Sequence, residues 1–510
     1  MQTAALQHSS YKLKVASSRG NIYDYKKNPI VGEEKDTIAT VFPCIQTAKS
    51  LSKLLSVDEI SEILPKLKSG KPFCVNIKNS FISDNYIKSF KVPKRYSDDQ
   101  LAPHIIGYLD SDGKGVCAIE KAFNNYLDDS KGYINLKYKV DALGRMLSRE
   151  DIAVENTMYK QTSGVVLTID KDIQRIVQSI AQEDLPKGAI IVTSVPNCEI
   201  RACVSMPNFS PNNISQALDN ENSPLLNRAF LSYNVGSIFK LVTAAAAVEN
   251  GSSPDNKFCC TGSINVNDST FHCSNSKVHG EIDLMGAISL SCNSYFVNLT
   301  RGFDGEKFLK LAMDFGFGKP IELAPEMFLS SGNLPEFEVL KNASSMANFS
   351  FGQGTLMATP VQISGLINTI AAKGKYVSPK LVLGLVNENL EYVKKNAPKP
   401  PKQIITKRCA NVLKSGMIAA VEMGTGIHGK PENYLAAAKT GTAQTGIKDG
   451  ERSVIQAWYA GFYPAENPKY SIVILSEDSN GGGASCGPIF KKIVDKIYSG
   501  FPEKFLINAK

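Results

Sequence analysis

The sequence has no run of about 18 or more apolar residues, the length that a helix needs to cross a membrane. Its N-terminus, MQTAALQHSSYKLKV, is too polar for a secretory signal peptide. Taken alone, these two absences favour a soluble protein. No internal repeat and no low-complexity tract is present, so repeat architectures are excluded.

Signals for nucleic acid and nucleotide binding are also missing. The net charge is +8, but the basic residues are dispersed and no aromatic-basic module occurs, which predicts no nucleic-acid partner. The glycine run at residues 481–483 lacks the Lys-Ser/Thr of a phosphate-binding loop, and we expect it to form a flexible loop. The single tryptophan, Trp458, is expected to pack on a strand. No metal or nucleotide motif appears, so we expect no cofactor.

One segment, NVGSIFKLVTAAAAVENG at residues 234–251, carries a pair of reactive side chains. Its alanines favour a helix that ends at Asn250 and Gly251 and begins near Ser237. Residues three apart on a helix share a face, so the Lys240 amine can reach the Ser237 hydroxyl. A serine beside a lysine is a nucleophile beside a base, provided that burial or a neighbouring cation lowers the lysine pKa. The N-terminus of the helix suits an oxyanion.

The four-residue pattern alone is common, since it also occurs at Ser9/Lys12, Ser50/Lys53 and Ser274/Lys277. Two later patterns give it context: SLSCNSYF contains Ser291-x-Asn293, and AAAKTGTAQTG contains a Lys-Thr-Gly-Thr that begins at Lys439. The second precedes VIQAWYAGFYP and YSIVILSED, which read as neighbouring antiparallel strands. At Gly441 a substrate backbone could approach the strand edge closely. Lys-Ser-Gly recurs at Lys68 and Lys414, and the second of these lies in KRCANVLKSGMIAAVE, a predicted amphipathic helix.

Ser-x-x-Lys, Ser-x-Asn and Lys-Thr-Gly in this order resemble the motifs of the penicillin-recognising serine acyltransferases. SSRGNIYD, around Arg19, resembles the N-terminal signature of class B penicillin-binding proteins, although Tyr25 to Asn28 lacks the arginine and glycine that often follow. LAPHIIGYLDSDGKGVCAIEKAFNNYL resembles the pedestal of that class. Four further segments resemble successive landmarks of the transpeptidase domain of that class: TIDKDIQ, GAIIVTSVPNCEIRACVSMPNFSPN, FGQGTLMATPVQ and AWYAGFYP.

The resemblance and the length of 510 residues imply two parts. Residues 1–160 would form an elongated, dimerisation-like pedestal, with a helix over Ser56 to Lys66. Residues 161–510 would form the transpeptidase domain, an α/β fold of the α+β type whose mainly antiparallel sheet is covered by helices on both faces. The proline-rich KKNAPKPPK, residues 394–402, is read as a surface connection.

The resemblance also implies catalytic roles. Ser237 would attack the carbonyl of the penultimate D-alanine of a peptidoglycan stem peptide, and Lys240 would take its proton. Ser291 would relay a proton to the leaving amine, and Asn293 would hold the substrate amide and Lys240. An amine of a second stem peptide would then resolve the acyl-enzyme and close a cross-link.

The last motif would bind substrate in this scheme. Lys439, Thr440 and Thr442, spaced by Gly441, would hold the terminal carboxylate of the stem peptide. Backbone N–H groups of Ser237 and Thr442 would form the oxyanion hole. The implied partners are stem peptides ending in D-Ala-D-Ala, β-lactam antibiotics, a membrane glycan polymerase and other cell-wall machinery.

The same motifs fit two rivals, a β-lactamase and a non-catalytic β-lactam sensor or scaffold. The Glu-x-x-Leu-Asn stretch of class A β-lactamases is absent between Asn293 and Lys439. Enzymes of elongation, septation and spore cortex synthesis all share the pattern. The resemblance implies the extracytoplasmic face of the bacterial membrane and a single N-terminal anchor, which normally stands just ahead of the point where this sequence starts.

Eleven cysteines are many for an exported protein, and in a large domain most are expected to be small buried hydrophobes. One cluster, FCCTGSINVNDSTFHCSNSKVHG, falls between the first two motifs. Free thiols are the favoured interpretation, followed by a Cys260–Cys273 bridge. A metal site is the third, because the spacing fits no standard zinc finger. The cluster contains Cys259, Cys260, His272, Cys273 and His279.

Overall fold

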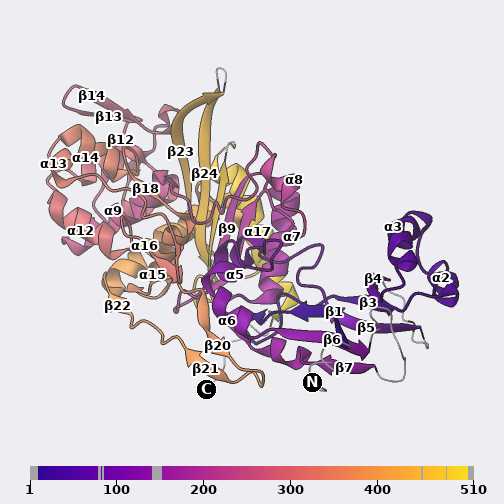
Figure 1. The fold of residues 1–510 in the computed structure, drawn as a ribbon. Coiled ribbons are helices and arrows are strands. Elements are labelled where there is room, and N and C mark those ends of the chain that lie inside the picture. Colours follow the sequence, from indigo (N-terminus) through magenta and orange to yellow (C-terminus); the bar gives the residue numbers. More distant parts are fainter. Residues whose placement is uncertain are drawn as a thin grey trace.

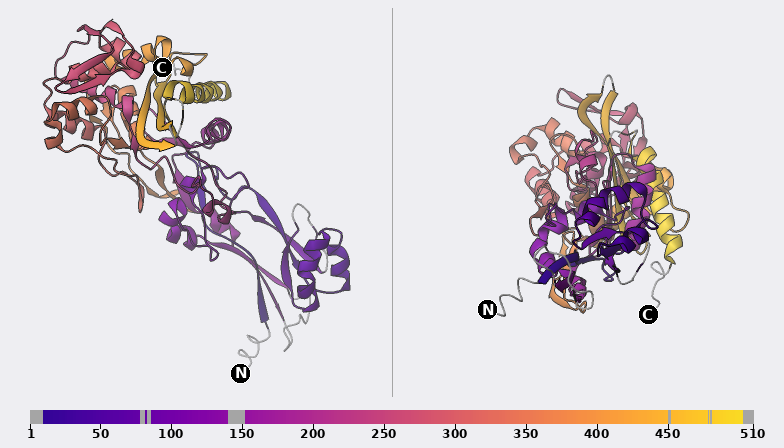
Figure 2. Two further views of the ribbon diagram at one scale, coloured as in Figure 1. Left: turned by 90° about the horizontal axis from the view of Figure 1, so that it is seen from above. Right: turned by 45° about the vertical axis from the view of Figure 1, so that its right-hand side comes forward.

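The computed structural model describes residues 10–77, 82, 86–139, 152–449, 452–477, 479 and 481–502. An elongated N-terminal arm projects from a larger body that contains the main sheet (Figures 1 and 2). Two helices, α2 (Ile45–Leu51) and α3 (Val57–Lys68), lie at the far end of the arm. The helix predicted after Ser56 is confirmed, because the Ser56 hydroxyl accepts a hydrogen bond from the Glu59 N–H and caps α3.

The arm also contains two small antiparallel sheets. In one, β6 (Gly132–Lys139) lies between β1 (Ser10–Ser18) and β7 (Ala153–Asn156). In the other, β3 (Lys35–Val41) lies between β4 (Phe73–Asn76) and β5 (Ile87–Pro93).

The body is built on a five-stranded sheet with the order β10-β9-β25-β24-β23, in which every neighbouring pair is antiparallel. The long strands β23 and β24 stand at one side of it, and β23 is the edge strand (Figure 1). The bounds are β9 Gly188–Ser194, β10 Ile200–Met206, β23 Ala437–Asp449, β24 Arg452–Tyr463 and β25 Tyr470–Glu477.

Helices cover both faces of this sheet, which confirms the predicted fold class. On β25, Ile472 and Ile474 join the core made with α7 (Lys171–Asp184) and α17 (Gly482–Gly500). The alternate residues, Val473 and Leu475, join the opposite core, to which α15 (Pro360–Ala371) and α16 (Lys407–Met423) contribute. Burial on both faces explains why YSIVILSED is apolar at consecutive positions.

The prediction of a flexible loop at residues 481–483 is wrong, because Gly482 is the first residue of α17. A Cβ atom at Gly482 would lie 2.1 Å from the Trp458 carbonyl oxygen and 2.4 Å from that of Gly441. The glycines therefore let the start of the helix pack directly on the sheet.

A fourth sheet joins the arm to the body, in the order β2-β8-β20-β21. Its first strand comes from the arm and pairs in parallel with β8. The bounds are β2 Asn21–Tyr23, β8 Gly164–Leu167, β20 Val382–Val386 and β21 Tyr392–Lys395.

An ion triad ties together the two segments that resemble class B signatures. The carboxylate of Glu120 is fully buried, with Arg19 Nε 3.3 Å from one oxygen and Arg95 Nη2 2.6 Å from the other. Arg19 also donates a 2.7 Å hydrogen bond to the Gly113 carbonyl. SSRGNIYD thus packs onto the turn and helix of the second segment.

The remaining elements are mostly short. The helices are α4 Pro103–Ile106, α5 Ala118–Ala122, α6 Asn124–Asp129, α8 Ser215–Leu218, α12 Gly305–Asp314, α13 Phe337–Leu340 and α14 Ala343–Ser350. The strands are β11 Tyr233–Asn234, β12 Phe258–Cys260, β13 Ser263–Val266, β14 Ser269–His272, β15 Gly280–Ile282, β16 Glu322–Ala324, β17 Met327–Phe328, β18 Met357–Ala358, β19 Lys375–Tyr376 and β22 Lys402–Gln403. The 3₁₀ turns include η1 Met158–Thr162 and η4 Ile427–Gly429.

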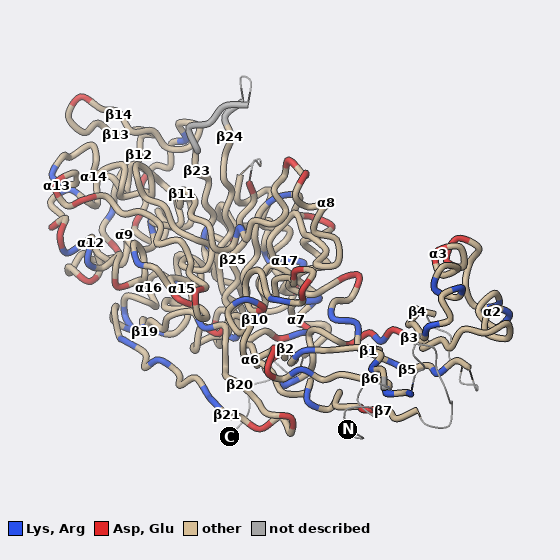
Figure 3. Tube along the Cα trace, in the orientation of Figure 1, with Lys and Arg blue, Asp and Glu red and all other residues tan. Residues whose placement is uncertain are grey.

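Charged residues are spread over the arm and the body, with both signs interspersed (Figure 3). This agrees with the dispersed charge expected from the sequence. Among the described residues, no helix combines the length and the apolarity that crossing a membrane requires.

Candidate active site

Ser237 lies in a 3₁₀ turn, η2 (Gly236–Phe239), that continues directly into α9 (Lys240–Glu249). The predicted helix is therefore present, with a tighter first turn, and it ends before Asn250 as expected. The first eight residues of α9 are buried, because its small alanine side chains let other elements surround it. Lys240 is fully buried, whereas Ser237 is partly exposed.

The FGQG segment holds the turn before Ser237 in place. The N–H of Gly236 donates a 3.0 Å hydrogen bond to the Gly352 carbonyl. A Cβ atom at Gly352 would lie 1.9 Å from the Gly236 oxygen, and Gly352 has φ +84. Only glycine, which has no Cβ atom, lets the two backbone segments come this close.

The edge strand β23 packs on the other side of the same turn. A Cβ atom at Gly236 would lie 2.9 Å from the Thr442 carbonyl oxygen, and one at Gly441 would lie 3.0 Å from Ile238 Cγ1. The residues on both sides of Ser237 therefore contact the Lys-Thr-Gly-Thr segment. Gly441 serves this packing in the structure.

Ser291 occupies a sharp turn between α10 (Leu284–Leu290) and α11 (Asn293–Leu299). Its backbone is left-handed, with φ 57 and ψ 40, a conformation that is uncommon for residues other than glycine. Cys292 follows as the N-cap of α11, and its sulfur accepts a 3.4 Å hydrogen bond from the Tyr295 N–H. The turn directs the Ser291 hydroxyl toward the two motif lysines.

Hydrogen bonds join residues of all three motifs. Lys240 Nζ lies 2.7 Å from the Ser291 carbonyl oxygen, 3.1 Å from Ser291 Oγ and 2.6 Å from Asn293 Oδ1. Lys439 Nζ lies 2.9 Å from the same Ser291 Oγ and 3.0 Å from the Thr440 carbonyl. Within the described part of the chain, the Ser237 hydroxyl makes no hydrogen bond, so it is free to meet a ligand. Catalytic hydrogen bonds of this type often form only when substrate is bound.

Burial lowers the pKa of both lysines. It brings the pKa of Lys240 to about 7, against a smaller opposing effect of the thiols of Cys292 and Cys273. The pKa of Lys439 falls well below its usual range through burial and then through the nearby charge of Lys240. A neutral amine is therefore accessible to this site at neutral pH, as a serine-activating base requires.

The two threonines of the Lys-Thr-Gly-Thr segment have different environments. Thr440 is buried, and its hydroxyl is 2.7 Å from that of Thr425, which follows α16. Thr442 is exposed, and its Oγ1 accepts a 3.4 Å hydrogen bond from the Gly482 N–H. Nothing in the sequence around Thr425 marked it as a neighbour of the site.

Trp458 is fully buried on β24, as predicted, and its Nε1 donates a 2.9 Å hydrogen bond to the Asn234 carbonyl. The competing motif matches lie elsewhere. Ser274 and Lys277 are exposed beside a short 3₁₀ turn, η3 (Ser274–Ser276), and Lys53 is exposed after α2. Ser9 lies outside the described residues. The predicted helix that carries Lys414 is α16.

The cysteine cluster differs in membership from the prediction. Cys259 and His272 are exposed. Four other side chains converge, with their ligand atoms all within 4.8 Å of one another: Cys260, Cys273, His279 and Cys292. The sulfurs of Cys260 and Cys273 are 3.7 Å apart, and all eleven cysteines are unbridged. Cys292 was not predicted to belong to the cluster, and the only feature of the sequence that pointed to it was its position inside the Ser-x-Asn motif.

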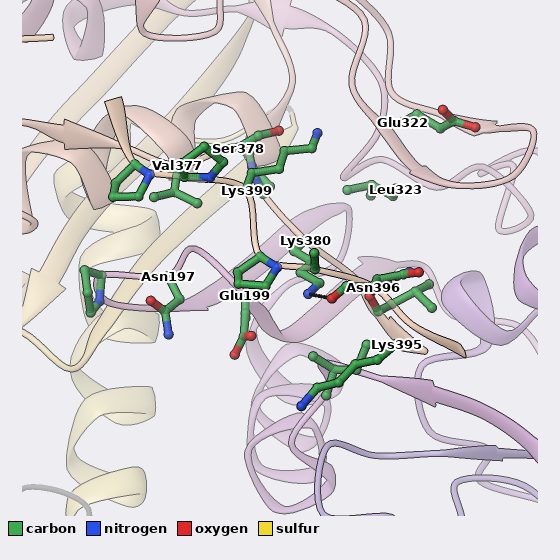
Figure 4. A pocket seen from close by; sticks show the side chains of 18 of the residues that line it. Asn197, Glu199, Glu322, Leu323, Val377, Ser378, Lys380, Lys395, Asn396 and Lys399 are labelled. Carbon is green, nitrogen blue, oxygen red and sulfur yellow. Dashed lines mark hydrogen bonds between the residues drawn. The ribbon is translucent and has the colours of Figure 1, made fainter. Parts of the chain in front are cut away.

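A pocket of about 840 Å³ lies away from these motifs, between β20 and the proline-rich segment (Figure 4). Glu199, Lys380, Lys395 and Lys399 line it, and the Lys380 amine donates a 2.9 Å hydrogen bond to the Asn396 carbonyl. No residue of the three motifs lines it, so it is separate from the candidate active site.

Comparison with known proteins agrees with the motifs. A family model described as the penicillin binding protein transpeptidase domain matches residues 188–495. Stage V sporulation protein D of Bacillus subtilis is 27% identical over 469 residues, which cover 88% of this chain and 69% of that protein. The peptidoglycan D,D-transpeptidase FtsI of Escherichia coli is 25% identical over 456 residues, which cover 83% of this chain and 73% of that protein.

Solved structures show the same fold at lower identity. Penicillin-binding protein 3 of Mycobacterium tuberculosis, complexed with aztreonam, matches with a TM-score of 0.70 and 22% identity, over 96% of this chain and 97% of that one. The complex between a penicillin-binding protein and MreC from Helicobacter pylori matches with a TM-score of 0.68 and 23% identity, over 96% and 98% of the two chains.

Proposed function

Because this chain belongs to the family of penicillin-binding protein transpeptidases, we propose that it cross-links peptidoglycan stem peptides through an acyl-enzyme on Ser237. It is a serine-type D,D-transpeptidase. One observation carries the assignment of residues: Lys240, Ser291 and Lys439 form a continuous hydrogen-bonded chain beside the turn that bears Ser237.

Lys240 is the base for acylation. In its neutral form the amine has two N–H groups, and two acceptors are in place for them, the Ser291 carbonyl and Asn293 Oδ1. These bonds leave the lone pair of the nitrogen for a proton. As the Ser237 oxygen attacks the carbonyl of the penultimate D-alanine, its proton passes to Lys240.

Ser291 carries the proton onward. Its hydroxyl lies within hydrogen-bond distance of both lysine amines, so it can receive a proton from Lys240 while giving its own to the leaving amine. The terminal D-alanine then departs as a neutral amine. The amine of a second stem peptide attacks the acyl-enzyme by the reverse proton path, and the cross-link forms with Ser237 regenerated.

The edge strand β23 binds the substrate backbone and its carboxylate. Thr442 is exposed on this strand, and Lys439 lies beneath it at the Ser291 hydroxyl. A carboxylate placed here would return the positive charge to Lys439, because an opposite charge favours the protonated amine. Thr440 completes the carboxylate site, and Gly441 lets the strand meet the Ser237 turn. Backbone N–H groups of Ser237 and Thr442 form the oxyanion hole, typically worth about 2.7–4 kcal/mol per donor.

Membership of the family also supports proposals about the domains, location and partners of the chain. Residues 161–510 form the catalytic unit and residues 1–160 the pedestal. The chain acts outside the cytoplasmic membrane. Its partners are stem peptides ending in D-Ala-D-Ala, β-lactams, a glycan polymerase and further cell-wall proteins of the kind found with the Helicobacter pylori relative.

Intact-mass spectrometry after exposure to penicillin tests the assignment. One penicilloyl adduct is expected, on the peptide that contains Ser237, and it should persist for many minutes. Ser237→Ala should abolish it with unchanged circular dichroism, while Ser274→Ala, at an exposed copy of the motif, should keep it. An adduct on another serine refutes the role of Ser237, and rapid hydrolysis of the adduct identifies a β-lactamase.

A further inference from the structure

Four potential metal ligands meet beside the Ser-x-Asn turn, although they come from separate elements. The pairing of β12 with β15 sets Cys260 opposite Gly280, the neighbour of His279. The β13–β14 hairpin then returns the chain, so that the Cys273 N–H donates to the Gly262 carbonyl at 2.9 Å. Cys292 arrives from the start of α11. This topology explains why the spacing matches no standard zinc finger.

Three of the six separations between the ligand atoms are close to those around a tetrahedral zinc ion. With zinc–sulfur bonds of about 2.3 Å and zinc–nitrogen bonds of about 2.0–2.1 Å, a tetrahedron requires about 3.8 Å between sulfurs and about 3.6 Å between sulfur and nitrogen. The Cys273 sulfur lies 3.7 Å from those of both Cys260 and Cys292. Nδ1 of His279 lies 3.3 Å from the Cys260 sulfur.

The surroundings suit thiolate ligands. Cys260, Cys273 and Cys292 are at most 3% exposed, and His279 is half-buried. Backbone N–H groups of Gly262 and Tyr295 each donate a 3.4 Å hydrogen bond to a cluster sulfur, and the Ser294 hydroxyl lies 3.4 Å from a third. Such donors stabilise negative sulfur and orient metal ligands.

A disulfide explains the convergence of these four side chains less completely than a metal ion does. Cys273 is equally close to two partners, so any bridge that it forms leaves the remaining cysteine and His279 with no role. The sulfurs would also have to move from 3.7 Å to about 2.05 Å. A metal ion uses all four groups with little movement.

We propose that the chain binds one structural zinc ion through four side chains, Cys260, Cys273, His279 and Cys292. Cys₃His is a usual ligand set for closed structural zinc sites. Three thiols lose their protons to solvent as the ion binds, and the neutral imidazole contributes Nδ1. This inference does not depend on the proposed enzymatic function.

The site positions the candidate active site. Cys292 lies between Ser291 and Asn293, the two residues that contact Lys240 Nζ. Asn293 is tied to the cluster a second time, because its Nδ2 donates a 2.8 Å hydrogen bond to the carbonyl of His272, the residue before Cys273. Zinc would thereby fix the Ser-x-Asn turn against the paired strands β12 and β15.

Elemental analysis of the purified chain tests the proposal. The protein is prepared with reductant and with an affinity tag that does not bind metal, then dialysed, and zinc is measured by inductively coupled plasma mass spectrometry. About one zinc ion per chain is expected. Cys292→Ser and His279→Ala should each reduce bound zinc at least several-fold, and His279→Cys should restore it by supplying a fourth sulfur.

Matched controls come from the same segment. Cys259→Ser and His272→Ala alter exposed neighbours of the ligands and should retain zinc. If the ligand variants misfold, cobalt added to the metal-free wild-type chain decides the matter, since tetrahedral cobalt–thiolate coordination gives intense visible and charge-transfer absorption.

Four outcomes would overturn the proposal: wild-type protein without zinc, ligand variants that keep it, cobalt without thiolate bands, or a Cys273 disulfide in place of metal. None of these bears on the penicilloyl adduct at Ser237, so the failure of either proposal is distinguishable from the failure of the other.

Discussion

Lys240 and Lys439 meet at a single oxygen atom, with the Ser291 hydroxyl 3.1 Å from the first amine and 2.9 Å from the second. Both amines are fully buried. Two ammonium groups held so close and away from water repel each other, so the site favours the loss of a proton. The geometry thus answers why a lysine can serve as a base at neutral pH.

The acylation rate should depend on pH through Lys240. Only the unprotonated amine accepts a proton, so the second-order rate of acylation by penicillin should rise with pH through about 7 and then level off. Lys240→Arg keeps a cation that does not deprotonate, so the rate should fall by about 10²–10⁴ and lose this rise. Stopped-flow measurements with a fluorescent penicillin between about pH 5.5 and 9 check both effects.

Lys414→Arg, at the Lys-Ser-Gly of α16, serves as the control and should leave the profile unchanged. A wild-type rate that is independent of pH, together with an active Lys240→Arg variant, would show that another group activates Ser237.

Removal of the Ser291 hydroxyl should break the link between the lysines. Ser291→Ala and Ser291→Gly should both slow acylation by roughly 10²-fold, the effect of losing one proton-transfer group. They should differ in stability, because the left-handed backbone of Ser291 suits glycine better than alanine by about 1–2 kcal/mol. Acylation rates and urea unfolding separate the two effects. Full activity in the glycine variant alone would assign the defect to the backbone and contradict the relay.

The three motifs could be recognised in the sequence, because each is a set of particular side chains at short spacing, and the structure places them together. The helix at residues 234–251 and the antiparallel strands after Lys439 followed from local composition. The contacts of Cys292 and Thr425 could not be predicted, since they depend on how distant elements pack. The error at Gly482 has the same origin: a glycine run signals backbone freedom, and only the tertiary structure shows that the freedom is used for close packing.

Neutralising Glu120 should destabilise the packing of SSRGNIYD against the segment that contains Glu120. Its buried carboxylate balances the guanidinium groups of Arg19 and Arg95, so Glu120→Gln leaves two cations in the interior. Breaking a buried pair in this way typically costs about 3–5 kcal/mol in the free energy of unfolding. Glu338→Gln, which removes an exposed pair with Lys341, should have little effect. Equal unfolding curves for the two variants would refute a structural role of the triad.

His104 should make the unfolding free energy depend on pH. It is buried against Phe209, and its Nε2 lies 2.6 Å from the Pro224 carbonyl, to which it donates. Burial lowers the pKa of His104 to about 4, from an ordinary value near 6.5 in the unfolded chain. As the pH falls below about 6.5, only the unfolded chain gains a proton, so stability present above that pH is lost progressively down to about 4.

The difference between wild type and His104→Gln isolates this contribution, because glutamine keeps an N–H donor for Pro224 and does not titrate. Between about pH 7 and 5 the unfolding free energy of the wild type should fall by about 2 kcal/mol more than that of the variant. Urea unfolding at each pH measures it, with His428→Gln, at an exposed histidine, as the control that should follow the wild type. Parallel curves for wild type and His104→Gln would mean that His104 becomes protonated in the folded protein as readily as in the unfolded chain.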